Sequence, residues 1–146
     1  MLLPDLAEWL AVRGHGVVAT DRPYGPHDVA LVVGPMPTGP DRCVVLEPYP
    51  GGAPAAGSSN QPEVVELVRI RVRGTPDTLV SARACQAIHD DLNGRGYTEL
   101  PSGRLLLNAV ARQLSPLASG TDTSNRHEHS TVIQVEHLAP TELRPL

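Results

Sequence analysis

The pattern of apolar and polar positions begins with a short helix. Leucines and a tryptophan recur there at helical spacing, namely Leu2, Leu3, Leu6, Trp9 and Leu10. Asp5 lies in the first turn and Gly14 is a typical helix stop. We therefore expect an amphipathic helix that ends near Arg13.

Short apolar runs separated by Gly, Pro and Asp then predict a series of strands. The expected strands are 17–20, 29–33, 43–47, 68–73, about 103–114, and 129–137. Residues 21–28 and 119–128 are polar and predict a loop and a hairpin tip. Residues 48–62 are rich in Pro, Gly and Ala, so we expect a long flexible loop that gains order only against a partner.

The clearest alternation lies in residues 68–73, where Val or Ile alternates with Arg. Side chains two apart on a strand share a face, so one face is apolar and the other carries Arg69, Arg71 and Arg73. After Gly74, the run Thr75-Pro76-Asp77 predicts an N-cap, a proline at the first helical position and an acid in the first turn. The helix that follows ends at Asn93-Gly94.

This order of elements predicts one α/β (α+β) domain over residues 1–146. Its expected architecture is a single mixed or antiparallel sheet with two helices packed on one face. No window has the ~20 apolar residues of a membrane span, and the first residues lack a basic segment and a cleavage site. We expect a protein made in the cytoplasm with no membrane partner.

Charge and cysteine content narrow the function classes. The net charge is −4 and no block of five basic residues exists, which argues against a general nucleic-acid binder. All basic residues other than histidine are Arg, because the chain contains no Lys. Cys43 and Cys85 form no CxxC pair, so we expect two buried free thiols.

Candidate chemistry is sparse. His127 and His129 could share a strand face as metal ligands, but a third ligand at a usual spacing is missing. Cys85 and His89 lie one helical turn apart, yet a working dyad also needs an orienting group and an oxyanion pocket. We therefore expect no catalytic residue, no metal, no cofactor and no small-molecule substrate.

Several short segments along nearly the whole chain carry a family resemblance. They are Leu3-x-x-Leu6-x-x-Trp9-Leu10, Gly34-Pro35-Met36-Pro37, Val44-Val45-Leu46 before Gly51-Gly52, residues 68–74 leading into Ile88-x-x-x-Leu92, Gln113-Leu114-Ser115-Pro116-Leu117, and Gly120-x-Asp122 with Arg126. Together they resemble the phage minor capsid protein family. The resemblance implies a tail-terminator-like fold in a virion structural protein at the head–tail junction.

The resemblance also implies the partners. A tail terminator forms a ring, commonly a hexamer, that stops tail-tube polymerisation and joins the head. It would contact the tail-tube protein and head–tail connector proteins, and genomic DNA could pass through its lumen. The alternative in the same setting is a head-closure or adaptor (neck) protein. A small cytoplasmic enzyme and a nucleic-acid-binding module are the alternatives from other classes.

Arg69, Arg71 and Arg73 are the candidate subunit-interface residues. Three like charges on one strand face repel each other unless carboxylates lie nearby. We expect those carboxylates to come from neighbouring strands, with Glu136 as an example, or from the adjacent subunit.

Overall fold

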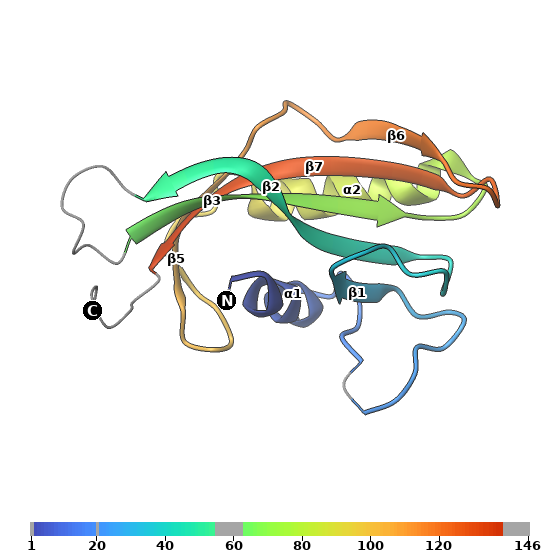
Figure 1. The fold of residues 1–146 in the computed structure, drawn as a ribbon, viewed down its shortest axis with the longest axis horizontal. Coiled ribbons are helices and arrows are strands. Elements are labelled where there is room, and N and C mark those ends of the chain that lie inside the picture. The colour runs from blue at the N-terminus through green and yellow to red at the C-terminus, as the bar shows by residue number, and fades with distance from the viewer. Residues whose placement is uncertain (1, 20, 55–62, 139–146) are drawn as a thin grey trace.

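The computed structural model describes residues 2–19, 21–54 and 63–138 (Figure 1). It contains helices α1 (Leu2–Val12) and α2 (Thr78–Leu92). The strands are β1 (Ala30–Val33), β2 (Cys43–Pro54), β3 (Glu63–Arg73), β4 (Thr98–Glu99), β5 (Leu105–Ala111), β6 (Leu117–Thr121) and β7 (His127–Leu138). The predicted α+β class is confirmed.

All seven strands belong to one mixed sheet. Its order is β1-β2-β3-β7-β5-β4, and β6 also pairs with β7. Only β1 and β2 are parallel, and the other named pairs are antiparallel. The long antiparallel ribbon of β2, β3 and β7 forms the centre, with Leu46 and Thr131 flanking Ile70 in register.

One face of this ribbon packs into the hydrophobic core. Alternate residues of β3, which include Ile70, are buried there with Leu46 of β2 and Ile133 of β7. Side chains of both helices belong to the same cluster, among them Leu6 and Ile88. In Figure 1, α2 lies behind β3 and β7, and α1 lies below β2 beside β1. We call the face of the ribbon that contributes to this core the covered face.

A polar cluster joins the ends of the two helices. Asp91, in the last turn of α2, accepts hydrogen bonds from Arg13 (2.9 and 3.0 Å) and Arg95 (2.8 Å) and is paired with His15 (2.9 Å). The guanidinium carbons of Arg13 and Arg95 lie 5.6 and 5.1 Å from the Trp9 ring centroid. Cation–π contacts and ion pairs therefore hold the end of α1 against α2.

The structure corrects several expected boundaries. Residues 48–54 belong to β2 rather than to a loop, because they continue the ladder with β3 after a register shift. Residues 55–62, the rest of the expected loop, lie outside the described residues. Of the expected strand at 17–20, the described residues 17–19 contain a single bridge, between Val17 and Ala30, and residue 20 lies outside the described residues. The sequence analysis also missed β4 and β6, and residues 119–121 of the expected hairpin tip belong to β6.

The start of α2 also differs from the expectation. Asp77, not Thr75, is the N-cap, and its side chain accepts a hydrogen bond from the Leu79 N–H. The Thr75 hydroxyl instead accepts from the Asp77 N–H, so Pro76 precedes the helix. Gly74 is required just before this turn, because a Cβ there would lie 2.8 Å from the Ser81 backbone nitrogen.

Candidate subunit interface

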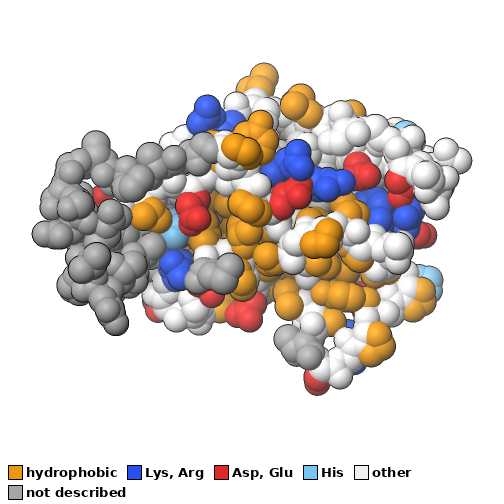
Figure 2. All heavy atoms as spheres, in the orientation of Figure 1, with side chains coloured by type: hydrophobic (Ala, Val, Ile, Leu, Met, Phe, Trp, Pro, Cys, Tyr) orange, Lys and Arg blue, Asp and Glu red, His pale blue; other side chains and the backbone are white. Residues whose placement is uncertain are grey.

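The other face of the central strands carries the candidate interface. Its side chains alternate with those of the covered face, so Arg69 and Arg71 point opposite to Ile70. It also carries Glu47 and Tyr49 of β2 and Val132 of β7. We call this surface the open face, and Figure 2 shows it as a row of charged side chains beside hydrophobic ones.

The charged row alternates in sign across three strands. The Arg69 Nε donates to Glu47 Oε1 at 2.7 Å, and Arg71 Nη2 donates to Glu128 Oε1 at 2.9 Å. Arg71 also lies 3.7 Å from Glu47, so one carboxylate is shared by both arginines. We call Arg69, Glu47, Arg71 and Glu128 the charge ladder. It relieves the repulsion expected between neighbouring arginines.

The predicted carboxylate partners therefore come from the chain's own neighbouring strands, but Glu136 is not among them. In the β3–β7 register Glu136 lies opposite Val65, near the far end of the ribbon. Glu128 lies opposite Arg73 and close to Arg71. The correct partner depended on this register, which the sequence pattern does not specify.

Arg73 departs from the expected exposed stripe. Only 3% of the residue is exposed, and its guanidinium donates to the carbonyl oxygens of Pro37 (2.7 Å), Pro40 (2.7 Å) and Asp41 (2.9 Å). The segment 37–41 therefore covers the end of the open face where Arg73 lies. Placing Arg73 with Arg69 and Arg71 on one accessible surface was wrong, because the loop after β1 satisfies its donors.

Exposed apolar side chains lie on both sides of the charge ladder, with Tyr49 on β2 and Leu117 on β6. Tyr49, Val110, Leu114 and Leu117 are exposed, and Leu114 is exposed to 98%. Tyr49 also lines a shallow cavity of about 190 Å³ with Leu67, Arg112, Gln113 and Val132. We call the exposed side chains of Tyr49, Val110, Leu114 and Leu117 the apolar patch. The sequence analysis missed the patch, although leucines within the polar segment 112–117 were a signal for it.

The thiol of Cys85 lies in the core, and among the described residues it forms no hydrogen bond with His89. Burial raises the pKa of Cys85 to about 12. The His89 Nδ1 is hydrogen-bonded to the Thr131 hydroxyl at 2.9 Å, so the imidazole has a different partner. A thiol with this pKa is a weak nucleophile at neutral pH. Cys43 and Cys85 are both free and buried, which confirms that prediction.

His127 and His129 lie at the start of β7. The His129 Nδ1 is paired with the Ser81 hydroxyl at 2.8 Å, and burial, aided by the nearby His127, lowers the pKa of His129. Across the described ranges 2–19, 21–54 and 63–138, no three His, Cys, Asp or Glu side chains are grouped so as to hold a metal ion. His129 thus has a structural role in joining β7 to α2.

Comparison of the chain with protein-family models and with curated proteins gives no match. In the part of the chain that the structure describes, neither helix is long and apolar enough to cross a membrane. What the structure itself defines is an α+β domain with a seven-stranded mixed sheet whose open face joins a charge ladder to an apolar patch.

Proposed function

We propose that this protein is a structural subunit of a tailed-phage virion, a tail terminator. Copies of the chain assemble into a closed ring, expected to be a hexamer, at the head-proximal end of the tail. The ring stops polymerisation of the tail tube and receives the connector proteins of the head, with genomic DNA passing through its lumen. The proposal rests on the motif resemblance together with the form of the open face.

The observation that carries this proposal is the apolar patch beside the charge ladder. Adjacent exposed apolar side chains are unfavourable in water, and burying them yields roughly 25 cal/mol for each Å² removed from solvent. Such patches on a domain surface mark sites of protein contact. The open face therefore has the mixed composition of an interface, with the exposed apolar side chains of Tyr49 and Leu117 on either side of the ion-paired Arg69 and Arg71.

The charge ladder gives this face its register. A ring closes only if two different surfaces meet at the same angle in every copy. A rim ion pair between the ladder and a neighbouring subunit contributes under about 1 kcal/mol, but it is repeated at each interface of the ring. Because the ladder alternates in sign, a neighbour displaced by one position would place like charges together.

The same geometry favours a subunit interface over a nucleic-acid-binding module or a small cytoplasmic enzyme. Arg69 and Arg71 are already bonded to carboxylates, and Arg73 is buried, so the stripe offers little charge for phosphate neutralisation. Cys85 is buried with a raised pKa, and among the described residues it forms no hydrogen bond with His89, so the geometry does not favour a Cys/His enzyme.

Sedimentation of interface variants tests the assembly. We expect the wild type to sediment as a ring, and Arg71→Glu and Leu114→Ser to sediment as folded monomers. Arg83→Glu is the matched control, because Arg83 is exposed on α2, away from the open face. A wild type that stays monomeric at all concentrations, or an Arg71→Glu ring that is stable at low and high salt, would contradict the proposal.

A polymerisation assay separates the tail terminator from the head-closure alternative. The purified ring is added to a growing tail tube of the same phage, and tube length is measured by electron microscopy. A terminator binds the tube end and yields tubes of limited length. A head-closure protein leaves tube growth unchanged and binds the head connector instead, which would assign the alternative role.

A further inference from the structure

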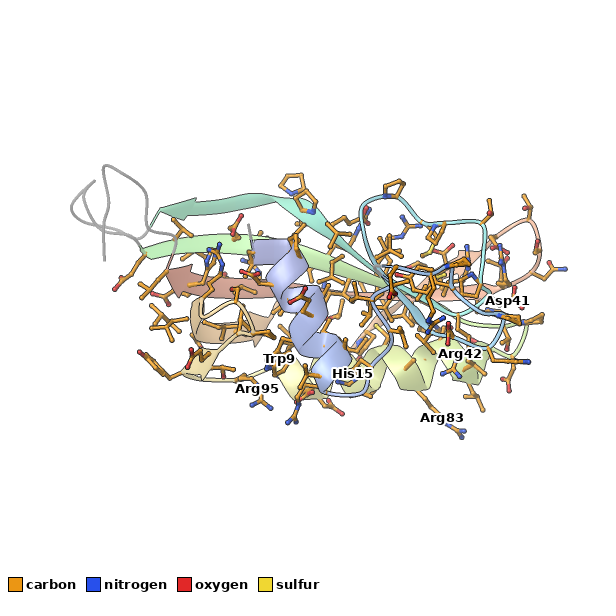
Figure 3. All side chains as sticks on the ribbon, turned by 90° about the horizontal axis from the view of Figure 1, so that it is seen from below. Trp9, His15, Asp41, Arg42, Arg83 and Arg95 are labelled. Carbon is orange, nitrogen blue, oxygen red and sulfur yellow. The ribbon has the colours of Figure 1, made fainter. Side chains whose placement is uncertain are left out.

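A groove lies beside α2, away from the open face. It has a volume of about 400 Å³ and is lined by Gly14, His15, Gly16, Val17, His27, Asp28, Val29, Arg42, Ala84 and Ala87. Four separate parts of the chain therefore form its walls: the turn after α1, the loop before β1, Arg42 just before β2, and one side of α2. Figure 3 shows Arg42 and Arg83 beside the same stretch of α2, with His15 further along it.

Small residues keep the groove open. Ala84 and Ala87 are three apart on α2 and so share one side of the helix. Gly16 lies tightly against the loop before β1, since a Cβ there would lie 2.7 Å from the Val29 carbonyl oxygen. The volume is within the range of pockets that hold small molecules, roughly 300–1,000 Å³.

The acidic groups near the groove are already neutralised. Asp28 accepts hydrogen bonds from the Gly25 N–H (2.8 Å) and Arg22 (3.2 Å), which hold the pKa of Asp28 below its usual value. Asp91, the partner of His15, is also bonded to Arg13 and Arg95. These carboxylates therefore leave the charge of other basic groups at the groove uncompensated.

Arg42 and Arg83 are unlike the other arginines that the structure describes. Each of the others bonds a carboxylate, an amide or a carbonyl oxygen. Within the described residues, Arg42 and Arg83 have no ion pair and no side-chain hydrogen bond. Arg42 lines the groove, and Arg83 directly precedes Ala84 on its wall. The groove thus has available cationic donors.

We propose that this groove binds a small phosphate monoester, with the phosphate held by Arg42 and the organic part seated against Ala84 and Ala87. A guanidinium fork donates two parallel hydrogen bonds to a phosphate. His27, which also lines the groove, provides a further ring nitrogen for the phosphate, whereas the Nε2 of His15 is already paired with Asp91. The site is separate from the open face and does not depend on ring assembly.

Titration calorimetry and phosphorus NMR with two probes, inorganic phosphate and adenosine monophosphate, test this inference on the full chain. We expect adenosine monophosphate to bind more tightly than phosphate, and phosphate more tightly than acetate. Arg42→Gln should weaken binding of the monophosphate about tenfold or more, in keeping with the loss of a charge-assisted hydrogen bond. Arg112→Gln, which removes the same charge on the open side of the sheet, should leave binding unchanged.

A second variant tests the shape of the groove. Ala87→Leu keeps the helix favourable and the charge constant, so it should fold normally while filling the space for the organic part. The substitution should weaken the binding of adenosine monophosphate more than the binding of inorganic phosphate. The proposal would be overturned if Arg42→Gln and Arg112→Gln lost the same affinity for adenosine monophosphate. It would also be overturned if the wild type bound both probes equally well, or bound neither at tens of millimolar. Thermal melts of the variants verify that they are folded.

Discussion

The two faces of the central strands show how the same alternating sequence meets two different environments. On the covered face, Ile70 is fully buried among apolar side chains, and polar groups there, such as His89 with Thr131, are paired within the protein. On the open face one position away, the Arg69 side chain is 41% exposed and pairs with Glu47. The covered face therefore supplies stability, whereas the open face keeps side chains exposed, and we propose it as the subunit interface.

The open face itself divides into two parts. The side chain of Arg71 is 28% exposed and belongs to the charge ladder, whereas Arg73, two residues on, is buried under the segment 37–41. Arg71 and Arg73 lie on the same strand face, but they differ in exposure because the segment 37–41 covers only Arg73. Four substitutions, from the largest expected effect to the smallest, test this contrast.

Replacing Ile70 by Ala should cause the largest loss. The change removes buried methyl groups from the middle of the core, so the free energy of unfolding should fall by roughly 2–5 kcal/mol. Urea unfolding followed by the fluorescence of Trp9, the single tryptophan, measures it. Leu67→Ala on the open face of the same strand is the control and should lose less than half as much. Similar losses would mean that the two faces are equally packed.

Replacing Arg73 by Met should come next. The change leaves the carbonyl oxygens of Pro37, Pro40 and Asp41 without their donor, and the free energy of unfolding should fall by about 2–3 kcal/mol. Arg71→Met is the matched control on the same strand face, and its loss in the monomer should be under about 1 kcal/mol. Comparable losses for both variants would show that the segment 37–41 does not depend on Arg73.

Replacing Asp91 by Asn tests how the helices are held together. Hydrogen bonds from Arg13, opposed by burial and aided by His15 and Arg95, hold the pKa of Asp91 well below its usual range. A folded-state pKa below the unfolded one stabilises the protein above pH ~4, and this contribution declines as the pH falls further. Asp91→Asn should therefore lower the free energy of unfolding by about 1–2 kcal/mol at pH 7.

The difference in the free energy of unfolding between wild type and Asp91→Asn should become smaller below pH 4. Urea unfolding at several pH values measures it. Asp90→Asn is the control, because Asp90 is exposed and pairs only with Gln86 among the described residues. Its effect should be small at every pH. A constant difference between wild type and Asp91→Asn over the whole pH range would contradict the role assigned to the carboxylate.

The smallest effect on folding should follow Arg69→Ala. Its ion pair with Glu47 is partly solvated, so a double-mutant cycle of the two residues in the monomer should give a coupling energy under about 1 kcal/mol. In the ring that we propose, the same pair of substitutions should shift the ring–monomer equilibrium more strongly than it shifts unfolding. A large coupling energy in the monomer would place the charge ladder among the features that stabilise the fold.

The sequence alone determined the features that depend on local chemistry. Helical spacing in residues 2–10, period-two alternation in 68–73 and the Asn93-Gly94 stop correctly predicted elements of the structure, because each is set by neighbouring side chains and backbone preferences. Alternation also identified which residues of β3 enter the core. The lack of a CxxC pair correctly predicted that both cysteines are free and buried.

The tertiary structure alone decided which distant segments meet. Whether Glu128 or Glu136 reaches Arg71 depends on strand register, and whether Arg73 is exposed depends on the path of segment 37–41. The groove near Arg42 likewise needs four separate segments of the chain. These contacts are non-local, and a period of two or 3.6 residues carries no information about them. Local sequence determines the face on which a side chain lies, whereas the fold of distant segments determines which residue it contacts.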